Sequence, residues 1–372
     1  MAKKTQQDEE LFEVEESEPH EVDLECDECG ARLTWDPAVD ALSCSYCGYS
    51  RTVERGEGTI LERPLAEAGA AARGLGADVR VLRCENCGAR VALGEIGTSE
   101  ACVFCGSASV LAQDENRNAI RPESLIPLDV SAGEVEERFK TWVRGLWFRP
   151  NALKNTKRFD AVGVYIPAWT FDCEVASAWS ADSGTYYYVT VRHAVRVNGR
   201  TQMRTRRVRK VRWRPAWGDR RDTYDDLQIL ASHGIKADLA RELGPFDTRD
   251  LVPYRPEYLA GWRAEEYQID LEQGWDQARD RITAMQRDRC AGDVPGDTHR
   301  RLSVRNTIAD VRWKHVLLPM WTLTYRFGGK PYTVLVHGQT GKVVGKAPFS
   351  VFKILGVIVL VLALAAMVFL FV

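Results

Sequence analysis

Eight of the ten cysteines in this 372-residue chain form four C-x2-C pairs, arranged in two matching frames. In each frame fourteen residues separate the two pairs, and the second frame starts 58 positions after the first. Two such pairs complete a closed tetrahedral four-thiolate site, which is structural rather than catalytic. We therefore expect two metal sites. Their ligands are Cys26, Cys29, Cys44 and Cys47 in the first frame and Cys84, Cys87, Cys102 and Cys105 in the second.

The residues around the cysteines repeat as well. Cys29-Gly30-Ala31-Arg32 matches Cys87-Gly88-Ala89-Arg90, and a glycine also follows the last cysteine of each frame. Glycine at these places permits the positive φ that a tight thiolate turn needs. The frames are typical of zinc ribbons, so we expect two zinc ions per chain, with iron of the rubredoxin type as the alternative.

The final nineteen residues, Ile354 to Val372, are all apolar or glycine. As a helix they would reach about 28 Å, close to the roughly 30 Å hydrocarbon core of a bilayer. Lys342, Lys346 and Lys353 precede them, and positive charge favours the cytoplasmic side. We expect a single-pass tail anchor in the cell membrane, with the N-terminal body cytoplasmic. A buried core helix is the alternative, although apolar residues on every face disfavour it.

Charge is strongly segregated along the chain. The formal net charge is only -2, which excludes an overall polycation but not a local basic patch. Residues 1–25 carry ten acids against two lysines and lack a hydrophobic pattern, so residues 1–23 are predicted to be a disordered acidic tail. The N-terminal residues contain no apolar stretch resembling a signal peptide, so we expect the body to stay in the cytoplasm, where reducing conditions favour metal thiolates over disulfides. Cys173 and Cys290 lie outside the pairs and are expected to be core thiols.

The segment from Arg192 to Arg214 contains ten Arg or Lys residues and no acid. It covers two strand-like stretches around an Asn198-Gly199 turn. We expect a three-residue bulged loop, because this register pairs Val197 with Thr201 and Val195 with Met203. The stretch is a candidate surface for lipid or a partner, and a solvated edge strand is the alternative. The residues concerned are Arg204, Arg206, Arg207, Arg209, Lys210, Arg212 and Arg214.

A larger domain is expected between the cysteine frames and the membrane segment. Ser131 and Glu134 form a capping box at the start of an amphipathic helix that ends before Pro150. A second amphipathic helix is predicted from Asp270 to Met285. Strand-like segments surround a repeated motif, Val164–Thr170 and Val316–Thr322, whose tryptophans are expected to pack in the core rather than bind a ligand.

These features predict an α+β protein in several parts. We expect zinc ribbons at 24–50 and 79–112 joined by a linker at 51–78, a β-rich domain with two amphipathic helices at 122–347, and a transmembrane helix at 352–372. No phosphate-binding loop, metalloprotease motif or nucleophile elbow occurs, so no catalytic residues are predicted and the chain is not expected to be an enzyme.

The combination of features resembles a bacterial family of TFIIB-type zinc-ribbon membrane proteins, over about residues 24 to 353. The motifs that carry the resemblance, besides the ribbons and the terminal helix, are Tyr165–Asp172, Leu318–Trp321, Gly338–Gly341 and Pro348. Members are sometimes labelled primosomal protein N′ or superfamily II helicase, but this chain lacks a nucleotide-binding motif. His337 departs from the expected Asn in its turn. The resemblance implies SPFH (flotillin-like) or phage-shock-type envelope-stress proteins as partners.

Two functions follow as hypotheses. The first is an adaptor or scaffold at the cytoplasmic membrane face, which recruits those envelope-stress proteins. The second is a membrane-tethered nucleic-acid-binding protein, in which the basic stretch grips phosphates and Trp213 and Trp217 stack on bases. Tethering favours the first, because lipid headgroups are a nearer anionic surface than nucleic acid.

Overall fold

The computed structural model describes residues 24–37, 39–53, 60–71, 73, 80–93, 101–113, 119–150, 160–197, 200–328 and 330–371. The expected acidic tail lies outside these residues, as do Asn198 and Gly199 of the expected turn. The described residues form an α+β fold with four α-helices and a large sheet, which confirms the predicted class.

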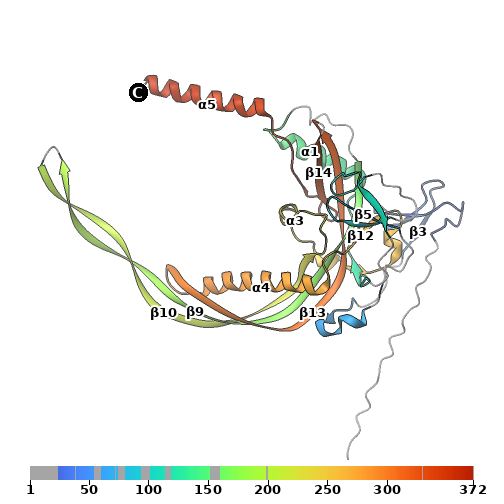
Figure 1. The fold of residues 1–372 in the computed structure, drawn as a ribbon, viewed down its shortest axis with the longest axis horizontal. Coiled ribbons are helices and arrows are strands. Elements are labelled where there is room, and N and C mark those ends of the chain that lie inside the picture. Colours follow the sequence, from blue (N-terminus) through green and yellow to red (C-terminus); the bar gives the residue numbers. More distant parts are fainter. Residues whose placement is uncertain are drawn as a thin grey trace, which may run out of the picture.

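Three long strands form the centre of a 12-stranded sheet (Figure 1). β9 (Asp160–Val197) pairs antiparallel with β10 (Arg200–Leu230) on one side and with β13 (Thr298–Phe327) on the other. Shorter strands extend the sheet at its ends. They are β4 (Arg63–Pro64), β8 (Ser124–Leu125), β11 (Val252–Pro253), β12 (Arg263–Glu266), β14 (Lys330–His337) and β15 (Val343–Gly345).

The centre of the sheet contains two units with the same order of elements, β8–α1–β9–β10 and β12–α4–β13–β14. The long strands of the two units pair so that Ile166 lies opposite Leu318. The short strands are exchanged, since β8 pairs parallel with β13 and β12 pairs parallel with β9. The two units therefore build one sheet together rather than two separate domains.

The tryptophans of the repeated motif occupy equivalent places in the two units. The Trp169 indole donates to the Ile269 carbonyl at 2.9 Å, and the Trp321 indole donates to the Val130 carbonyl at 2.8 Å. Ile269 and Val130 each directly precede the N-cap of a helix, α4 and α1 respectively. Both rings are buried, which confirms the prediction that they are core residues.

Both predicted amphipathic helices are present. α1 (Ala132–Gly145) starts at the predicted Ser131 capping box and buries Val135, Phe139 and Val143. α4 (Leu271–Asp293) starts after Asp270 as predicted but continues past Met285, burying Gln286 and Cys290 in its last turns. The remaining helices are α3 (Ala237–Leu243), α5 (Val351–Phe371) and the 3-10 turns η1 (Leu65–Ala70), η2 (Thr248–Asp250) and η3 (Pro256–Leu259).

The first cysteine frame folds as a separate three-stranded antiparallel sheet of β1 (Thr34–Asp36), β2 (Ala41–Ser43) and β3 (Ser50–Thr52). This ribbon packs onto the body. The Trp35 ring contacts Tyr258 edge-on with 4.7 Å between centroids, and the Trp262 indole donates to the Trp35 carbonyl at 2.9 Å.

The second cysteine frame is continuous with the large sheet. Its strands are β5 (Arg80–Cys84), β6 (Arg90–Leu93) and β7 (Val110–Gln113), and β12 joins β6 to β9. Residues of the expected linker also contact this sheet, because Arg63–Pro64 pair with β13. The ribbons thus lie on the body rather than apart from it.

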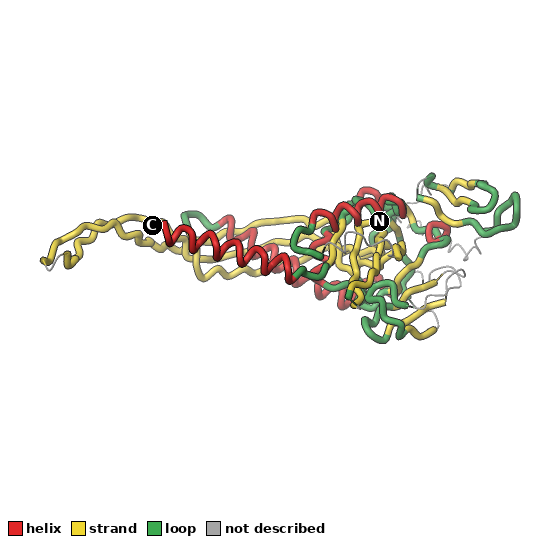
Figure 2. Tube along the Cα trace, turned by 90° about the horizontal axis from the view of Figure 1, so that it is seen from above, coloured by secondary structure: helices red, strands yellow, loops and turns green. Residues whose placement is uncertain are grey.

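Beyond Gly184 the β9–β10 hairpin leaves the sheet as a two-stranded ribbon, seen at the left of Figures 1 and 2. We call this ribbon, Thr185–Val197 with Arg200–Arg212, the basic arm. The predicted three-residue loop at its tip is wrong, because Val197 pairs with Arg200 across two residues. The prediction assumed a buried valine face, but none of the arm's described side chains is buried, so the Asn-Gly turn preference sets the register.

Candidate metal centres and basic arm

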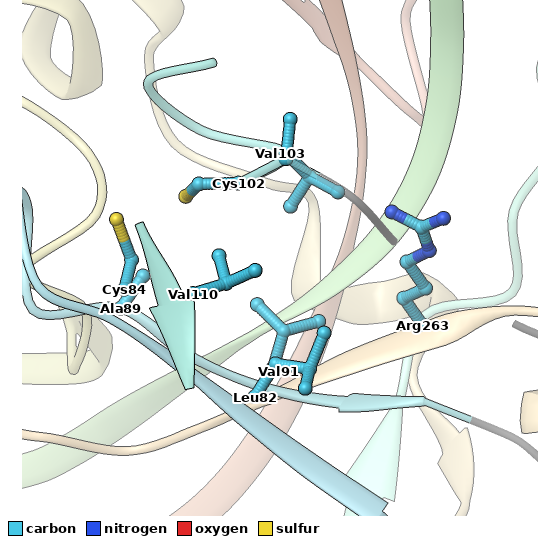
Figure 3. Close-up of a pocket in the computed structure, with 9 residues that line it drawn as sticks. Leu82, Cys84, Ala89, Val91, Cys102, Val103, Val110 and Arg263 are labelled. Carbon is cyan, nitrogen blue, oxygen red and sulfur yellow. The ribbon is translucent and has the colours of Figure 1, made fainter. Parts of the chain in front are cut away.

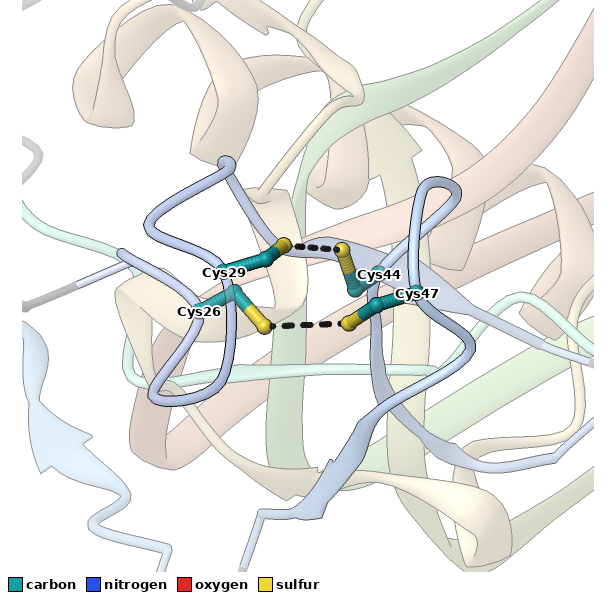
Figure 4. A group of neighbouring side chains, drawn as sticks. All are labelled: Cys26, Cys29, Cys44 and Cys47. Atoms are coloured by element: carbon teal, nitrogen blue, oxygen red, sulfur yellow. Dashed lines mark hydrogen bonds between the residues drawn. The ribbon is translucent and has the colours of Figure 1, made fainter.

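The eight predicted cysteines come together in two groups of four, and within each group the sulfur atoms lie within 4.8 Å of one another. Figure 4 shows the first group, with Cys26 Sγ 3.5 Å from Cys47 Sγ and Cys29 Sγ 3.6 Å from Cys44 Sγ. In the second group Cys84–Cys105 and Cys87–Cys102 are each separated by 3.6 Å. The two groups have nearly the same geometry, as the repeated frame predicts.

These distances match a tetrahedral metal site. Zn–S bonds of about 2.3 Å place the sulfurs of a tetrahedron roughly 3.8 Å apart, close to the observed separations. A disulfide would need about 2.05 Å, so the cysteines are not bridged. Each group can therefore hold one metal ion, and its all-thiolate ligand set is consistent with zinc.

Backbone turns place the sulfurs in the same way in both groups. In the first, Gly30 N–H donates to the Cys26 carbonyl at 2.8 Å; in the second, Gly88 N–H donates to the Cys84 carbonyl at 2.9 Å. Both glycines have positive φ, 70° and 79°. These turns leave other N–H groups free to point at sulfur, which favours the thiolate form.

In each group one thiol has a lowered pKa without a cation. Backbone N–H groups of Cys47 and Tyr46 lower the pKa of the Cys44 thiol to about 6. In the second group a hydrogen bond from the Cys87 side chain, helped by the N–H groups of Cys105 and Phe104, lowers the pKa of Cys102 to about 5. Sharing that proton raises the pKa of Cys87. A bound cation would complete the deprotonation.

The two centres differ in how deeply they are embedded. Two cysteines of each group are buried, but Cys29 and Cys47 of the first group are exposed, whereas Cys87 and Cys105 of the second are half-buried. Beside the second group lies a small pocket, shown in Figure 3, whose lining is apolar except for Arg263 and the thiols. Without converging polar groups this pocket is a packing gap next to the metal centre rather than a ligand site.

The seven predicted basic residues fall on β10, six in the basic arm and Arg214 at its base opposite Ser183. Partners across an antiparallel pair share a face, and faces alternate along a strand. Arg204, Arg206, Lys210 and Arg212 therefore lie on one face of the arm, and Arg207 and Arg209 lie on the other. The arm is basic on both faces.

Tyrosines from β9 lie between these cations. The guanidinium of Arg209 lies 4.3 Å from the centroid of the Tyr186 ring, and Arg207 and Arg212 lie 5.4 Å from Tyr188 and Tyr187. Such cation–π pairs orient the guanidinium groups without neutralising them. The arm can therefore present organised positive charge to an anionic surface.

The predicted membrane segment is a helix, α5, in which Val351–Val368 is long and apolar enough to cross a membrane. None of that stretch is buried against the rest of the protein. This contradicts the alternative of a core helix, which would be mostly buried.

A buried ionic cluster was not predicted. Lys314 Nζ contacts Asp226 Oδ1 at 2.8 Å and Glu62 Oε1 at 2.9 Å, and the Asp226 N–H donates to Asp172 at 2.6 Å. Burial raises the pKa of Asp172 to about 7. The cluster ties the segment between the ribbons to all three long strands. Its members come from four segments that are far apart in the sequence, so no local sequence pattern predicts the cluster.

The chain is similar to the uncharacterized protein YdjG of Bacillus subtilis (strain 168), with 26% identity over 348 residues. The match covers 88% of this chain and 91% of YdjG. No family model and no solved structure matches the chain.

Proposed function

We propose that this chain is a membrane-anchored adaptor whose basic arm binds acidic surfaces at the cytoplasmic face of the cell membrane. Zinc fills both four-cysteine groups and stabilises the body, and α5 anchors it in the membrane. The observation that carries the proposal is the arm itself. It leaves the body as a ribbon that is basic on both faces, and Arg192 to Arg214 includes no acid.

Such an arm is poorly stabilised by its own contacts. An isolated two-stranded hairpin is marginal in water, and neighbouring like charges weaken it further. An anionic surface would relieve that repulsion, at about 1 kcal/mol for each Lys or Arg near a lipid headgroup layer. Acidic faces of membrane-associated proteins offer the same chemistry. By the family resemblance, the partners are SPFH or phage-shock-type proteins.

The alternative is a membrane-tethered nucleic-acid-binding protein. Positive charge on both faces and interleaved aromatic rings favour it, because a strand of nucleic acid can wrap such a ribbon. One of the two predicted stacking residues is already occupied, since the Arg300 guanidinium lies 4.2 Å over the Trp213 ring. Trp217 remains exposed. The adaptor is therefore the better supported of the two.

The test uses the full-length protein in vesicles with and without anionic phospholipid. Replacing Arg207 and Arg209 with alanine should weaken the salt-sensitive binding of the arm to anionic phospholipid about thirtyfold at low ionic strength. The matched control replaces exposed Arg241 and Arg287, which lie outside the arm and should have little effect. In a second experiment the full-length protein is purified from detergent-solubilised membranes, with and without nuclease, and the proteins that are captured with it are identified.

Two outcomes would decide against the adaptor. Proteins captured with the wild-type chain could be lost after nuclease treatment, or short oligonucleotides could bind the arm more tightly than anionic liposomes do. Either result would support the nucleic-acid function instead.

A further inference from the structure

Exposed aromatic side chains gather at the base of α5, and they come from two distant parts of the chain. Trp147 is 71% exposed and Phe148 44% exposed, in the loop that follows α1. Phe349 and Phe352 are 64% and 88% exposed, at the start of α5. We call these four residues the aromatic collar. Large apolar rings held in water are unfavourable, so the collar needs a partner.

Direct contacts hold the two halves of the collar together. Lys353 Nζ donates to the carbonyls of Trp147 and Arg149 at 3.0 and 2.9 Å, and the Ser350 N–H donates to the Phe148 carbonyl at 2.8 Å. The Arg149 guanidinium lies 3.6 Å over the Phe349 ring. The loop after α1 is thus attached to the first turn of α5.

The composition of the collar fits one kind of partner. Aromatic rings next to Lys or Arg, at the end of an apolar helix, are typical of the boundary between hydrocarbon and headgroups. Neither Leu146–Pro150 nor Pro348–Ile354 contains an acid. Arg149 and Lys353 supply the positive charge of these two segments. Anionic headgroups would suit these charges.

We propose that the Trp147–Phe148 loop is a further membrane-contacting element, which inserts into the phospholipid interface beside α5. The inference rests on the proposed membrane anchoring of α5 and goes beyond it. The occupant is the phospholipid bilayer, because the exposed rings are continuous with the surface of the helix that crosses it. The loop directly follows α1, so its insertion would hold the body close to the membrane instead of leaving it on a free tether.

The experiment replaces Trp147 with the photo-crosslinking residue p-benzoylphenylalanine in the full-length protein, reconstituted in phospholipid vesicles. A matched control places the same residue at Tyr46, which is 85% exposed in the first ribbon. After irradiation, mass spectrometry should find lipid adducts at position 147 about fivefold or more above position 46. Phe349→p-benzoylphenylalanine should give lipid adducts as well.

Equal lipid yields at positions 147 and 46 would overturn the inference. Crosslinks from position 147 to a second copy of the chain would also overturn it, by identifying a protein partner. Flotation of the same samples separates this failure from a failure of the proposed anchoring. If the protein floats with vesicles but gives no lipid adduct at position 147, only the proposed insertion of the collar is wrong. If the protein does not float, the proposed anchoring by α5 is wrong.

Discussion

The four glycines that follow the cysteine pairs all have positive φ, from 70° at Gly30 and Gly106 to 78° at Gly48 and 79° at Gly88. Among the described residues, a Cβ at Gly30, Gly48 or Gly88 would meet open space. The requirement for glycine at these three positions is therefore conformational rather than steric. This is why the two four-cysteine groups could be predicted from sequence: the cysteines and the turn residues of each group follow a fixed spacing.

Replacing Cys26 with serine should remove one metal ion per chain and leave the other, because the two groups share no ligand. Elemental analysis of the full-length protein should find two zinc ions in the wild type and one in Cys26→Ser. Cys84→Ser should also leave one, because its group loses its metal ion independently of the first. Iron, or a single zinc in the wild type, would contradict this prediction.

His315 should make stability depend on pH. Burial lowers the pKa of this imidazole to about 4, while Nδ1 lies 2.9 Å from the Ile120 carbonyl and Nε2 is buried without a partner among the described residues. The unfolded chain binds the proton near pH 6.5 and the folded chain only near 4. The contribution of neutral His315 to the free energy of unfolding should therefore be complete above pH 6.5. It should fall by about 3 kcal/mol as the pH drops to 4.

Denaturant unfolding of the full-length protein across that pH range would measure this slope. The His315→Gln variant should lose it, even if its stability is lower throughout. The exposed His299→Gln serves as the control and should keep it. An unchanged slope in His315→Gln would assign the pH dependence to other groups.

Among the elements, α4 depends on one close approach that its sequence pattern does not explain. Gly274 interrupts the apolar face, yet a Cβ there would lie 2.6 Å from the Trp169 ring. The glycine lets the helix pack directly on the Trp169 ring. The indole of Trp169 also donates a hydrogen bond to the carbonyl of Ile269, just before the helix begins. The repeated tryptophan motif and the helix start are thereby fixed to each other.

Gly274→Ala should consequently destabilise the protein by about 1–3 kcal/mol, because the added methyl group overlaps a buried ring. At Gly292, in the same helix, an added methyl group would have no atom of the described residues within 4 Å apart from its chain neighbours and the adjacent backbone of its own helix. Gly292→Ala should therefore be neutral or stabilise by up to about 1 kcal/mol. Chemical denaturation of both variants measures the difference. Equal effects would show that the Trp169 contact is not close.

An element could be predicted from the sequence when the contacts that form it join residues close together along the chain. The Ser131 capping box and the apolar period identify α1 from local residues alone. β8 and β12 have only two and four residues, which is too short for a recognisable alternation of apolar and polar side chains. They form because each pairs with a distant long strand. The ion pair between Lys314 and Glu62 joins residues that are 252 positions apart. No local pattern could have predicted it.

At the scale of the whole molecule, α5 and the basic arm leave the body on the same side, away from the ribbons (Figures 1 and 2). The arm has thirteen residues per strand beyond Gly184, about 43 Å in extended conformation, and α5 has 21 residues, about 31 Å as a helix. The two elements are comparable in length. If α5 spans the membrane, the position of the arm relative to the bilayer must be decided by its chemistry.

That chemistry excludes the hydrocarbon core. Each Arg or Lys at the centre of a bilayer costs about 2.5–3.5 kcal/mol, and a two-stranded ribbon would also leave both outer edges without hydrogen-bond partners in lipid. The arm should therefore lie along the headgroup layer, which requires α5, together with the attached loop after α1, to turn relative to the long strands. A fluorescent side chain in place of the exposed Met203 should be quenched by headgroup-level and soluble quenchers, but not by quenchers at the acyl-chain ends. Strong quenching from the bilayer centre would instead place the arm inside the membrane, and no quenching by lipid at either depth would place it on another partner.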